Sequence, residues 1–533
     1  VAWCLHIERP AGSAFRSSRA AGFLYSGQGR MMPMISGVKV SKGFLRISLN
    51  LLVLTILAGA GLPAQLIPIR TVPVASGDQF LTVPSETLGM GGVMIALDDS
   101  LADGWVNPAK GIFIGESSFL GAPTFYGISD HGGGGKTFPM VGLFQGDAWF
   151  GGGALAVQQI DNPEERWGWR PFIEPGVIWD SQPQRLSDVS SRNLYARGFI
   201  GRKVDSGPWS VGFGFSTAQL NAVDGVDLLY AGADRIDQSG SASDVRLGLY
   251  RSGERDRISL VGVYNRISMT HDVTWTDFIW RDDFNRVATR RIEVNEDKTR
   301  TIGGHLNWDR DLSAPGWRIG ATATVNQKSH PKIPNYQIQN IPRDPGTTWA
   351  YEAGFGIART RGETTFGVDM VLQPIWSETW QEANERVITV SGTVIKPGGR
   401  TIENEFFFTN VILRTGLSHQ LGNLELQAGL EMRSYDYELE QVNHIEGSFR
   451  DLEESWMEWS PTMGAVLHFS DVDLRYTGRF TTGTGRPGIA WEWEEGVRVA
   501  DSFNDFIIAP QGPLTLQDAL VHTHQLSVKI PVR

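Results

Sequence analysis

The feature that most constrains this sequence is a two-residue alternation that recurs along most of the chain after residue 65. The clearest segment, 424–433, has as its apolar members Leu424, Leu426, Ala428, Leu430 and Met432. Comparable segments lie at 209–216, 317–325, 462–469 and 525–532. Such alternation places an apolar row on one face of a β-strand and small or polar groups on the other. No sustained helical period competes with it, so we predict an all-β fold.

The predicted connections alternate between short and long. The short ones are 145–147, 204–208, 252–256, 310–316, 360–363, 421–423 and 470–473, and the first connection, 127–136, is glycine-rich. The long ones are 160–189, 222–240, 269–296, 329–346, 375–403, 438–453 and 483–521. A β-sandwich has no reason to segregate its loops in this way, whereas a membrane barrel has tight turns on one rim and long loops on the other.

We therefore expect a transmembrane antiparallel up-and-down β-barrel of about sixteen strands, with fourteen as the close alternative. Because a sheet in lipid cannot leave edge amides unpaired, the first and last strands should pair with each other.

Composition agrees with a barrel and excludes one class of partner. Glycine accounts for 62 of 533 residues, well above the usual share of about 7%. The net charge of −11 argues against a nucleic-acid partner. Tryptophan suits the membrane–water interface, and eight tryptophans are candidates for an aromatic girdle or for packing within loops: Trp275, Trp280, Trp376, Trp380, Trp456, Trp459, Trp491 and Trp493.

The N-terminal region reads as an export signal. Lys39, Lys42 and Arg46 precede an apolar run at 47–62, and Pro63-Ala64-Gln65 follows it. We assign 34–64 as a signal peptide and 1–33 as a non-native upstream extension. A single membrane anchor is the alternative, but the run is short for one. Cys4, the one cysteine, precedes the signal, so the mature chain would hold no disulfide and no thiolate metal site.

The segment after the signal carries a motif. A glycine-rich stretch leads to an acidic pair and then to Asn-Pro-Ala; its positions are Gly89, Gly91, Gly92, Ala96, Asp98, Asp99, Asn107, Pro108 and Ala109. This pattern resembles the N-terminal signature of the outer-membrane long-chain fatty-acid and hydrocarbon transporter family (FadL type), and equally that of the related PorV-type barrels.

The resemblance implies a short hatch at 65–115 inside a barrel formed by 116–533, with substrate passing through the outer wall or past the hatch. It also implies fourteen strands, and a C-terminal aromatic residue that the barrel-assembly machinery, an expected partner, reads. This chain instead ends Ile530-Pro531-Val532-Arg533.

Motifs with catalytic or ligand chemistry have simpler explanations. Residues 131–137 lack the first glycine of a phosphate loop, and the glycine pattern at 483–488 lies in an expected surface loop. His522 and His524 could bind a metal weakly, but no third ligand is identifiable. Ser418 and His419 would point to opposite sides of a strand, and acidic residues at 446–458 read as a solvated loop. We predict no enzyme activity, no catalytic residue, no metal and no cofactor.

Two functions remain open. Charged and polar residues on the inward rows make the lumen partly charged: Arg414, Glu425, Gln427, Glu431, Arg433 and Lys529. The first hypothesis is passage of hydrophobic, fatty-acid-like small molecules across the bacterial outer membrane, with membrane lipid and lipopolysaccharide around the barrel. The second is a structural or interaction barrel of PorV type that supports protein secretion or surface attachment.

Overall fold

A computed structural model describes the part of the chain that forms the hatch and the wall. The described residues are 67, 70–71, 73–129, 132–161, 190–204, 207–223, 235–280, 286–330, 346–383, 385–487, 506–509 and 512–532. The predicted signal peptide and upstream extension, and Trp491 and Trp493, lie outside them. None of the helices in these ranges is both long and apolar enough to cross a bilayer.

The wall is a closed antiparallel barrel of 16 strands, which confirms the predicted fold and the larger strand count. The first strand is broken at Ala122-Pro123, and both halves pair with the last: Ser118 is opposite Pro531 and Ile128 is opposite Val521. In chain order the strands are β1 (Ser118–Gly121) with β2 (Thr124–Ile128), β3 (Gly134–Gln145), β4 (Trp149–Asp161), β5 (Ser190–Lys203), β6 (Trp209–Leu220), β7 (Arg235–Ser252), β8 (Asp256–Trp280), β9 (Arg286–Asp311), β10 (Trp317–His330), β11 (Gly346–Arg361), β12 (Thr364–Glu382), β15 (Arg400–Leu421), β16 (Leu424–Asn443), β17 (Ser448–His468), β18 (Asp473–Pro487) and β20 (Gly512–Pro531).

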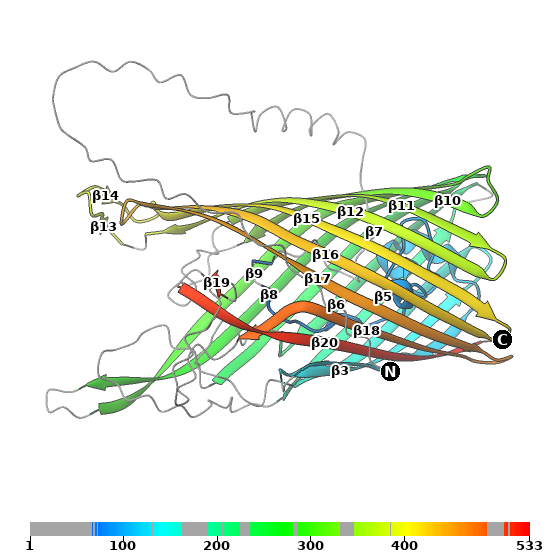
Figure 1. Ribbon diagram of the computed structural model, residues 1–533, viewed down its shortest axis with the longest axis horizontal. Coiled ribbons are helices and arrows are strands. Elements are labelled where there is room, and N and C mark those ends of the chain that lie inside the picture. Colours follow the sequence, from blue (N-terminus) through cyan, green and yellow to red (C-terminus); the bar gives the residue numbers. More distant parts are fainter. Residues whose placement is uncertain are drawn as a thin grey trace, which may run out of the picture. The chain divides into compact units, whose positions relative to one another are not determined.

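All seven predicted short turns join strands at one end of the barrel, here called the inner rim, where β1 begins and β20 ends. Two of the predicted long loops are wrong. Most of 269–296 belongs to β8 and β9, and most of 438–453 belongs to β16 and β17. These strands continue past the apolar band toward the opposite, outer rim (Figure 1). Charged and polar side chains interrupt the hydrophobic alternation there, although the backbone pairing continues.

The two faces of the wall differ as a membrane barrel requires. Exposed outward side chains are largely apolar, for example Phe213, Leu247, Phe355, Met370 and Leu426. Inward rows carry buried polar groups such as Gln158, Asn193, Asp244, Asp369 and Gln427. Hydrocarbon contact accounts for the first set, and a polar lumen for the second.

Tryptophans mark both edges of the apolar band. At the inner rim, three cross-strand pairs place an arginine over a tryptophan ring at 4.9–5.9 Å: Trp149–Arg202, Trp209–Arg251 and Trp317–Arg359. Toward the outer rim, Trp349, Tyr351, Trp376 and Phe407 form a chain of ring contacts. Such cation–π and interfacial positions suit a ring with one wet edge.

Trp456, predicted to lie in an outer loop or the aromatic girdle, instead faces the lumen and stacks on Tyr435 at 4.7 Å. β17 continues through this position, so its alternation turns the side chain of Trp456 inward.

The described part of the segment predicted as a hatch, for which we keep that name, lies inside the wall near the inner rim (blue segment, Figure 1). It holds three short helices, η1 (Leu88–Met90), α2 (Asp103–Val106) and η2 (Pro108–Phe113). Three further short strands lie outside the wall count: β13 (Val387–Ile388) pairs with β14 (Val394–Ile395), and β19 (Phe506–Ala509) folds back on β20.

Candidate functional site

The glycine-rich half of the motif forms a tight turn. Gly91 and Gly92 both have φ of 71°, a left-handed conformation that side chains disfavour. The amides of Met90 and Gly92 donate to the carbonyl of Thr87 at 2.8 and 3.0 Å. Thr462 of β17 fixes the turn to the wall, because its Oγ1 accepts from the Gly91 amide at 2.8 Å and donates to the Gly89 carbonyl at 3.0 Å.

Inward-facing glycines of the wall let the hatch backbone lie directly against the strands. A Cβ at Gly416 would lie 2.1 Å from the Met90 carbonyl oxygen, and one at Gly429 would lie 2.1 Å from the Gly91 nitrogen. At Gly320 it would lie 2.4 Å from the Ile95 carbonyl oxygen. These distances leave no room for a side chain, which explains part of the glycine content.

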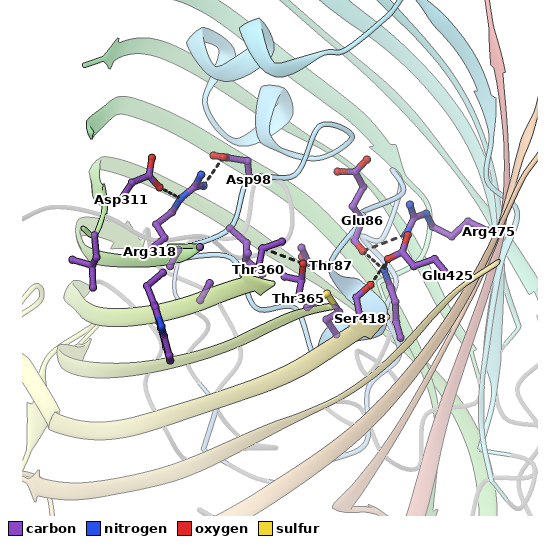
Figure 2. Close-up of a pocket in the computed structure, with 18 of the residues that line it drawn as sticks. Glu86, Thr87, Asp98, Asp311, Arg318, Thr360, Thr365, Ser418, Glu425 and Arg475 are labelled. Atoms are coloured by element: carbon purple, nitrogen blue, oxygen red, sulfur yellow. Dashed lines mark hydrogen bonds and ion pairs between the residues drawn. The ribbon is translucent and has the colours of Figure 1, made fainter. Parts of the chain in front are cut away.

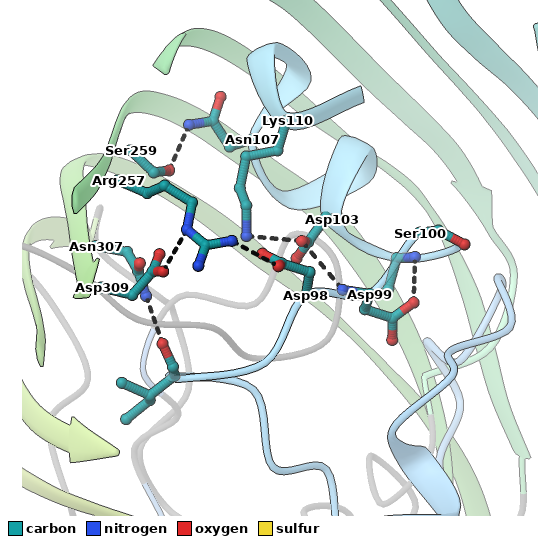
Figure 3. A network of polar contacts seen from close by, with 12 residues as sticks. Asp98, Asp99, Ser100, Asp103, Asn107, Lys110, Arg257, Ser259, Asn307 and Asp309 are labelled. Atoms are coloured by element: carbon teal, nitrogen blue, oxygen red, sulfur yellow. Dashed lines mark hydrogen bonds and ion pairs between the residues drawn. The ribbon is translucent and has the colours of Figure 1, made fainter. Parts of the chain in front are cut away.

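Asp98, the first residue of the acidic pair, ties the hatch to the opposite wall (Figure 3). Its Oδ2 lies 2.6 Å from Nη1 of Arg318 on β10 and 3.2 Å from Nη1 of Arg257 on β8. Arg257 also contacts Asp309 and Asp311, at 2.8 and 2.9 Å. Burial opposes ionisation of Asp98, but Lys110, Arg318 and Arg257 outweigh it and lower the pKa of this carboxyl.

Asp99 acts within the hatch rather than toward the wall. Its carboxylate accepts hydrogen bonds from Ser85 Oγ at 2.6 Å and from the amides of Glu86, Leu101 and Ala102 at 2.8–3.0 Å. Burial, followed by the charge of Glu86, raises the pKa of Asp99. The adjacent acids therefore have different roles: one attaches the hatch to the wall and the other shapes its turn.

A second charged pair joins the two helical turns of the hatch. Asp103 Oδ2 lies 2.7 Å from the Lys110 Nζ (Figure 3). Burial raises the pKa of Asp103 to about 6, although Lys110 opposes the shift. Burial works against the charge of Lys110, but Asp103 and Asp98 more than compensate and raise the pKa of this ammonium group.

The Asn-Pro-Ala end of the motif anchors on β6–β8. Asn107 accepts from the Ala109 amide at 3.0 Å, which caps η2, and its Nδ2 donates to Ser259 Oγ at 2.7 Å. Pro108 follows at the first turn of η2, where its missing amide costs nothing. Ser210 donates to the Ala109 carbonyl at 2.9 Å.

The start of the described hatch, here called the strap (Arg70–Ala75 without residue 72), lies between β17 and β18. Arg70 Nη1 donates to both carboxylate oxygens of Glu458 on β17, at 2.7 and 2.9 Å. On the other side Val74 forms a parallel bridge to Gly485 of β18, whose amide donates to the Pro73 carbonyl at 2.8 Å. The strap thus bridges two neighbouring wall strands.

The six residues predicted to face the lumen lie on inward rows. Three of them meet: Glu431 lies 2.7 Å from Arg414 and 3.4 Å from Arg433. Gln427 Nε2 donates to Glu425 at 2.7 Å and to the Glu86 carbonyl of the hatch at 2.9 Å. Lys529 lies apart, 3.2 Å from Glu116.

Several residues of this network were missed from the sequence. Arg479 contacts Glu431 and Asp78, at 2.9 and 3.4 Å, and Asp369 accepts from the Met94 amide at 2.7 Å. The sequence offered one signal for such contacts, which is a charged residue on an inward row of otherwise small or polar residues. Arg318 in the 317–325 segment is an example.

A cavity of about 670 Å³ lies between the hatch and the inner ends of the strands from β9 to β18 (Figure 2). Its apolar lining comes from Met90, Ala96, Leu97, Leu312 and Ala358, and Trp317 borders it at the rim. Arg318 and Arg475 add two cations, and Arg475 Nη1 donates to the Glu86 carbonyl at 3.2 Å. Glu86, Asp98, Asp311 and Glu425 add four carboxylates.

Above the hatch, the inner wall carries what we call the aromatic patch. Its members on the wall are Ala350, Ile375, Phe406, Phe408, Tyr437 and Leu439, with Leu452 and Trp456 packed against them, and Ile67 of the hatch segment belongs to the same cluster. Phe406 and Phe408 stack at 5.9 Å, and Phe408 meets Tyr437 at 5.3 Å. These clustered side chains are at most 7% exposed, so the patch is a buried apolar cluster among inward rows that are otherwise rich in polar residues.

The chemical motifs set aside from the sequence form no site in the described ranges. Ser418 donates to Glu425, whereas His419 contacts Thr364. His524 contacts the Tyr476 hydroxyl at 2.8 Å on the outward face. Among the residues placed by the structure, no group of three or more His, Cys, Asp and Glu side chains could hold a metal ion.

Comparisons with protein-family models and with curated protein sequences each found no match. Among solved structures, the CymD monoaromatic hydrocarbon channel is 12% identical, over 85% of this chain and 98% of its own, with a TM-score of 0.36. The ferric-catecholate import receptor Fiu from E. coli K12 is 9% identical, over 78% and 81%, with a TM-score of 0.36. The copper transporter OprC is 9% identical over the same shares, with a TM-score of 0.35. Similarity this low carries no information on substrate or partner.

Proposed function

We propose that this protein mediates the passage of hydrophobic, fatty-acid-like small molecules across the bacterial outer membrane. The observation that carries the proposal is the aromatic patch. Phe406, Phe408, Tyr437 and Leu439 project inward and pack with Ile67 of the hatch segment in a buried apolar cluster, where a purely aqueous channel would be lined by polar groups. An apolar solute gains free energy by leaving water for such a surface.

In this proposal the solute passes from the aromatic patch to the hatch, which is the barrier, and then into the cavity between the hatch and the inner ends of the strands. Met90, Leu97 and Leu312 offer an apolar wall there, and Arg318 and Arg475 lie beside it. A molecule with an apolar body and a polar head group matches this mixed lining. In this proposal the outer rim faces the cell surface, the outward apolar band contacts lipid and lipopolysaccharide, and the chain arrives by signal-peptide export and the barrel-assembly machinery.

The test is uptake of dodecanoate, dodecane and maltose into liposomes that contain the purified barrel. We expect saturable uptake of the two apolar solutes, and a fall of about tenfold when Phe406 and Phe408 both become serine, because each lost ring contact weakens apolar binding. Phe355→Ser, on the outward face, is the matched control. Absence of saturable uptake of either apolar solute would exclude the proposal.

A second candidate, the interaction barrel of PorV type, is favoured by one observation. β8, β9 and β15–β17 are 20–26 residues long, whereas β3 and β6 have 12. About ten residues suffice to cross the membrane, so the outer ends of the longer strands form a projecting wall. Such a wall is a surface on which a partner could dock.

A further inference from the structure

The outer half of β17 has a free edge. β17 and β18 pair from His468–Asp473 to Trp459–Thr482, and beyond that point β17 continues alone on this side to Ser448, within the part of the chain that the structure places. A positive φ at Gly483 and a register shift between Thr481 and Thr484 accompany the divergence. Figure 1 shows β17 running on toward β13 and β14 after β18 has ended.

The register identifies which backbone groups this edge presents. The His468 amide donates to Asn423 on the β16 side, and the Phe469 amide donates to Val472 on the β18 side. The β16–β17 register continues without a bulge to Ser448. Odd-numbered residues therefore direct their N–H and C=O groups to the open side: Phe449, Asp451, Glu453 and Ser455. No backbone hydrogen bond to a described residue satisfies them there.

The side chains beside this edge divide by face. On the outward face, carboxylates stand directly opposite one another, as Glu405–Glu440, Glu440–Asp451 and Glu438–Glu453. None of these five forms a salt bridge with a described cation. Like charges in register destabilise a sheet. On the inward face, Leu452 and Trp456 continue the aromatic patch to the edge.

We propose that this edge of β17 binds an extended basic peptide by strand addition. Main-chain hydrogen bonds to the residues from Phe449 to Ser455 would supply the pairing, as in other sheets that accept an added strand. Basic side chains at every second position would face Asp451 and Glu453, and the intervening positions would be apolar, against Leu452 and Trp456. The strap already shows this mode of contact on the other side of the gap, where Val74 pairs with the edge of β18.

Charge complementarity selects this occupant over two others. A second copy would bring its own Asp451 and Glu453 against the same acids, and charged edges of this kind resist self-pairing. Residues 488–505 of this chain carry Glu492, Glu494, Glu495, Asp501 and Asp505 against a single Arg498. A second copy and residues 488–505 would both add negative charge beside Asp451 and Glu453, whereas a basic strand reduces the repulsion between these acids.

The test uses the full chain in phosphatidylcholine nanodiscs and a fluorescent peptide of alternating lysine and valine. We expect saturable binding by anisotropy, with a Kd about tenfold weaker for the Asp451→Lys/Glu453→Lys variant, since charge pairs across an interface contribute at this level. Glu254→Lys/Glu363→Lys, an equal charge change at the inner rim, is the matched control and should bind as the parent does. An N-methylated peptide of equal charge should lose binding, because it cannot pair along the edge.

If the N-methylated peptide bound as tightly as the unmodified one, binding would not depend on backbone pairing. If the two double variants weakened binding equally, the effect would be general charge attraction. Either result would overturn the proposal. Binding that appears only after removal of 488–505 would show that the chain occupies its own edge, and dimerisation of the chain that the peptide does not inhibit would assign the edge to a second copy. Either result also overturns it. None of these readouts depends on solute uptake.

Discussion

The hatch is attached to two sides of the barrel by different kinds of contact. Against β15–β17 it lies backbone to backbone, with Gly416 and Gly429 leaving space for Met90 and Gly91. Against β8 and β10 charge is added to such neutral contacts: Asp98 reaches Arg257 and Arg318, beside the Asn107–Ser259 hydrogen bond and the close approach of Ile95 to Gly320. The first contact depends on shape and is insensitive to salt, whereas the second depends on charge and weakens as ions screen it. We call the first the fixed side, and the second, where salt can weaken part of the hold, the releasable side.

The largest expected effect comes from filling the fixed side. In Gly429→Val the new Cβ would lie 2.1 Å from the Gly91 nitrogen, so the hatch must move away from the wall. We expect the conductance of the barrel in planar bilayers to rise by about tenfold or more, because overpacking against backbone has no local remedy. Gly262→Val, where no atom lies within 4 Å, should leave conductance unchanged. A closed Gly429→Val barrel would contradict the assignment of the fixed side.

An intermediate effect is expected from the releasable side. Asp98→Asn removes the contacts with Arg318 and Arg257 but leaves both arginines near Asp309 and Asp311. The loss should be about 1–2 kcal/mol, within the range for hydrogen bonds to charged groups. Release can be followed by maleimide labelling of Val93→Cys, whose parent side chain is fully buried. We expect about tenfold faster labelling at low salt and a smaller difference at high salt.

Asp237→Asn, which breaks an exposed pair with Arg235, is the control and should change nothing. A difference that persists undiminished in high salt would argue that Asp98 acts through shape rather than charge.

The smallest effect concerns pH. The docked hatch has Asp103 with a pKa raised to about 6, so docking favours the protonated acid. Docking is therefore strongest below the ordinary carboxyl pKa and weakens as pH rises through about 6. Asp103→Asn should abolish this dependence. The measurement compares the maleimide-labelling rate of Val93→Cys with that of Val93→Cys/Asp103→Asn. We expect the ratio of the first rate to the second to grow only a few-fold from about pH 4 to pH 7, because Lys110 stays beside Asp103 when the hatch moves.

A parent-to-variant ratio that is flat across this window, or one that falls as pH rises, would show that the Asp103 carboxyl does not report docking.

The sequence was sufficient for features that are local or periodic. Alternation located the strands, turn residues located the inner rim, and the motif located the glycine turn at Gly91 and Gly92. It failed where alternation ended, as in the outer parts of β16 and β17, because charged residues beyond the lipid band no longer report which face they occupy.

Long-range partners were also out of reach. Asp98 meets arginines 159 and 220 residues away in the chain, and Arg70 meets Glu458 across 388 residues. Only the closing of the barrel brings such residues together. In the sequence, each of these partners is recognisable only as a charged residue, and many solvated strands contain such residues.

The gap between β17 and β18 has a mechanical consequence. When every pair of neighbouring strands is hydrogen-bonded along its whole length, the inter-strand hydrogen bonds fix the circumference of the barrel at every height. Here the ring of inter-strand hydrogen bonds is complete at the inner rim. In the described residues it is interrupted between β17 and β18 on the outer-rim side of Trp459 and Thr482. The lower part is therefore rigid, whereas the upper part can widen or narrow without breaking a hydrogen bond between wall strands. Among the described residues, only the strap limits this movement, through its contacts with Glu458 and Gly485.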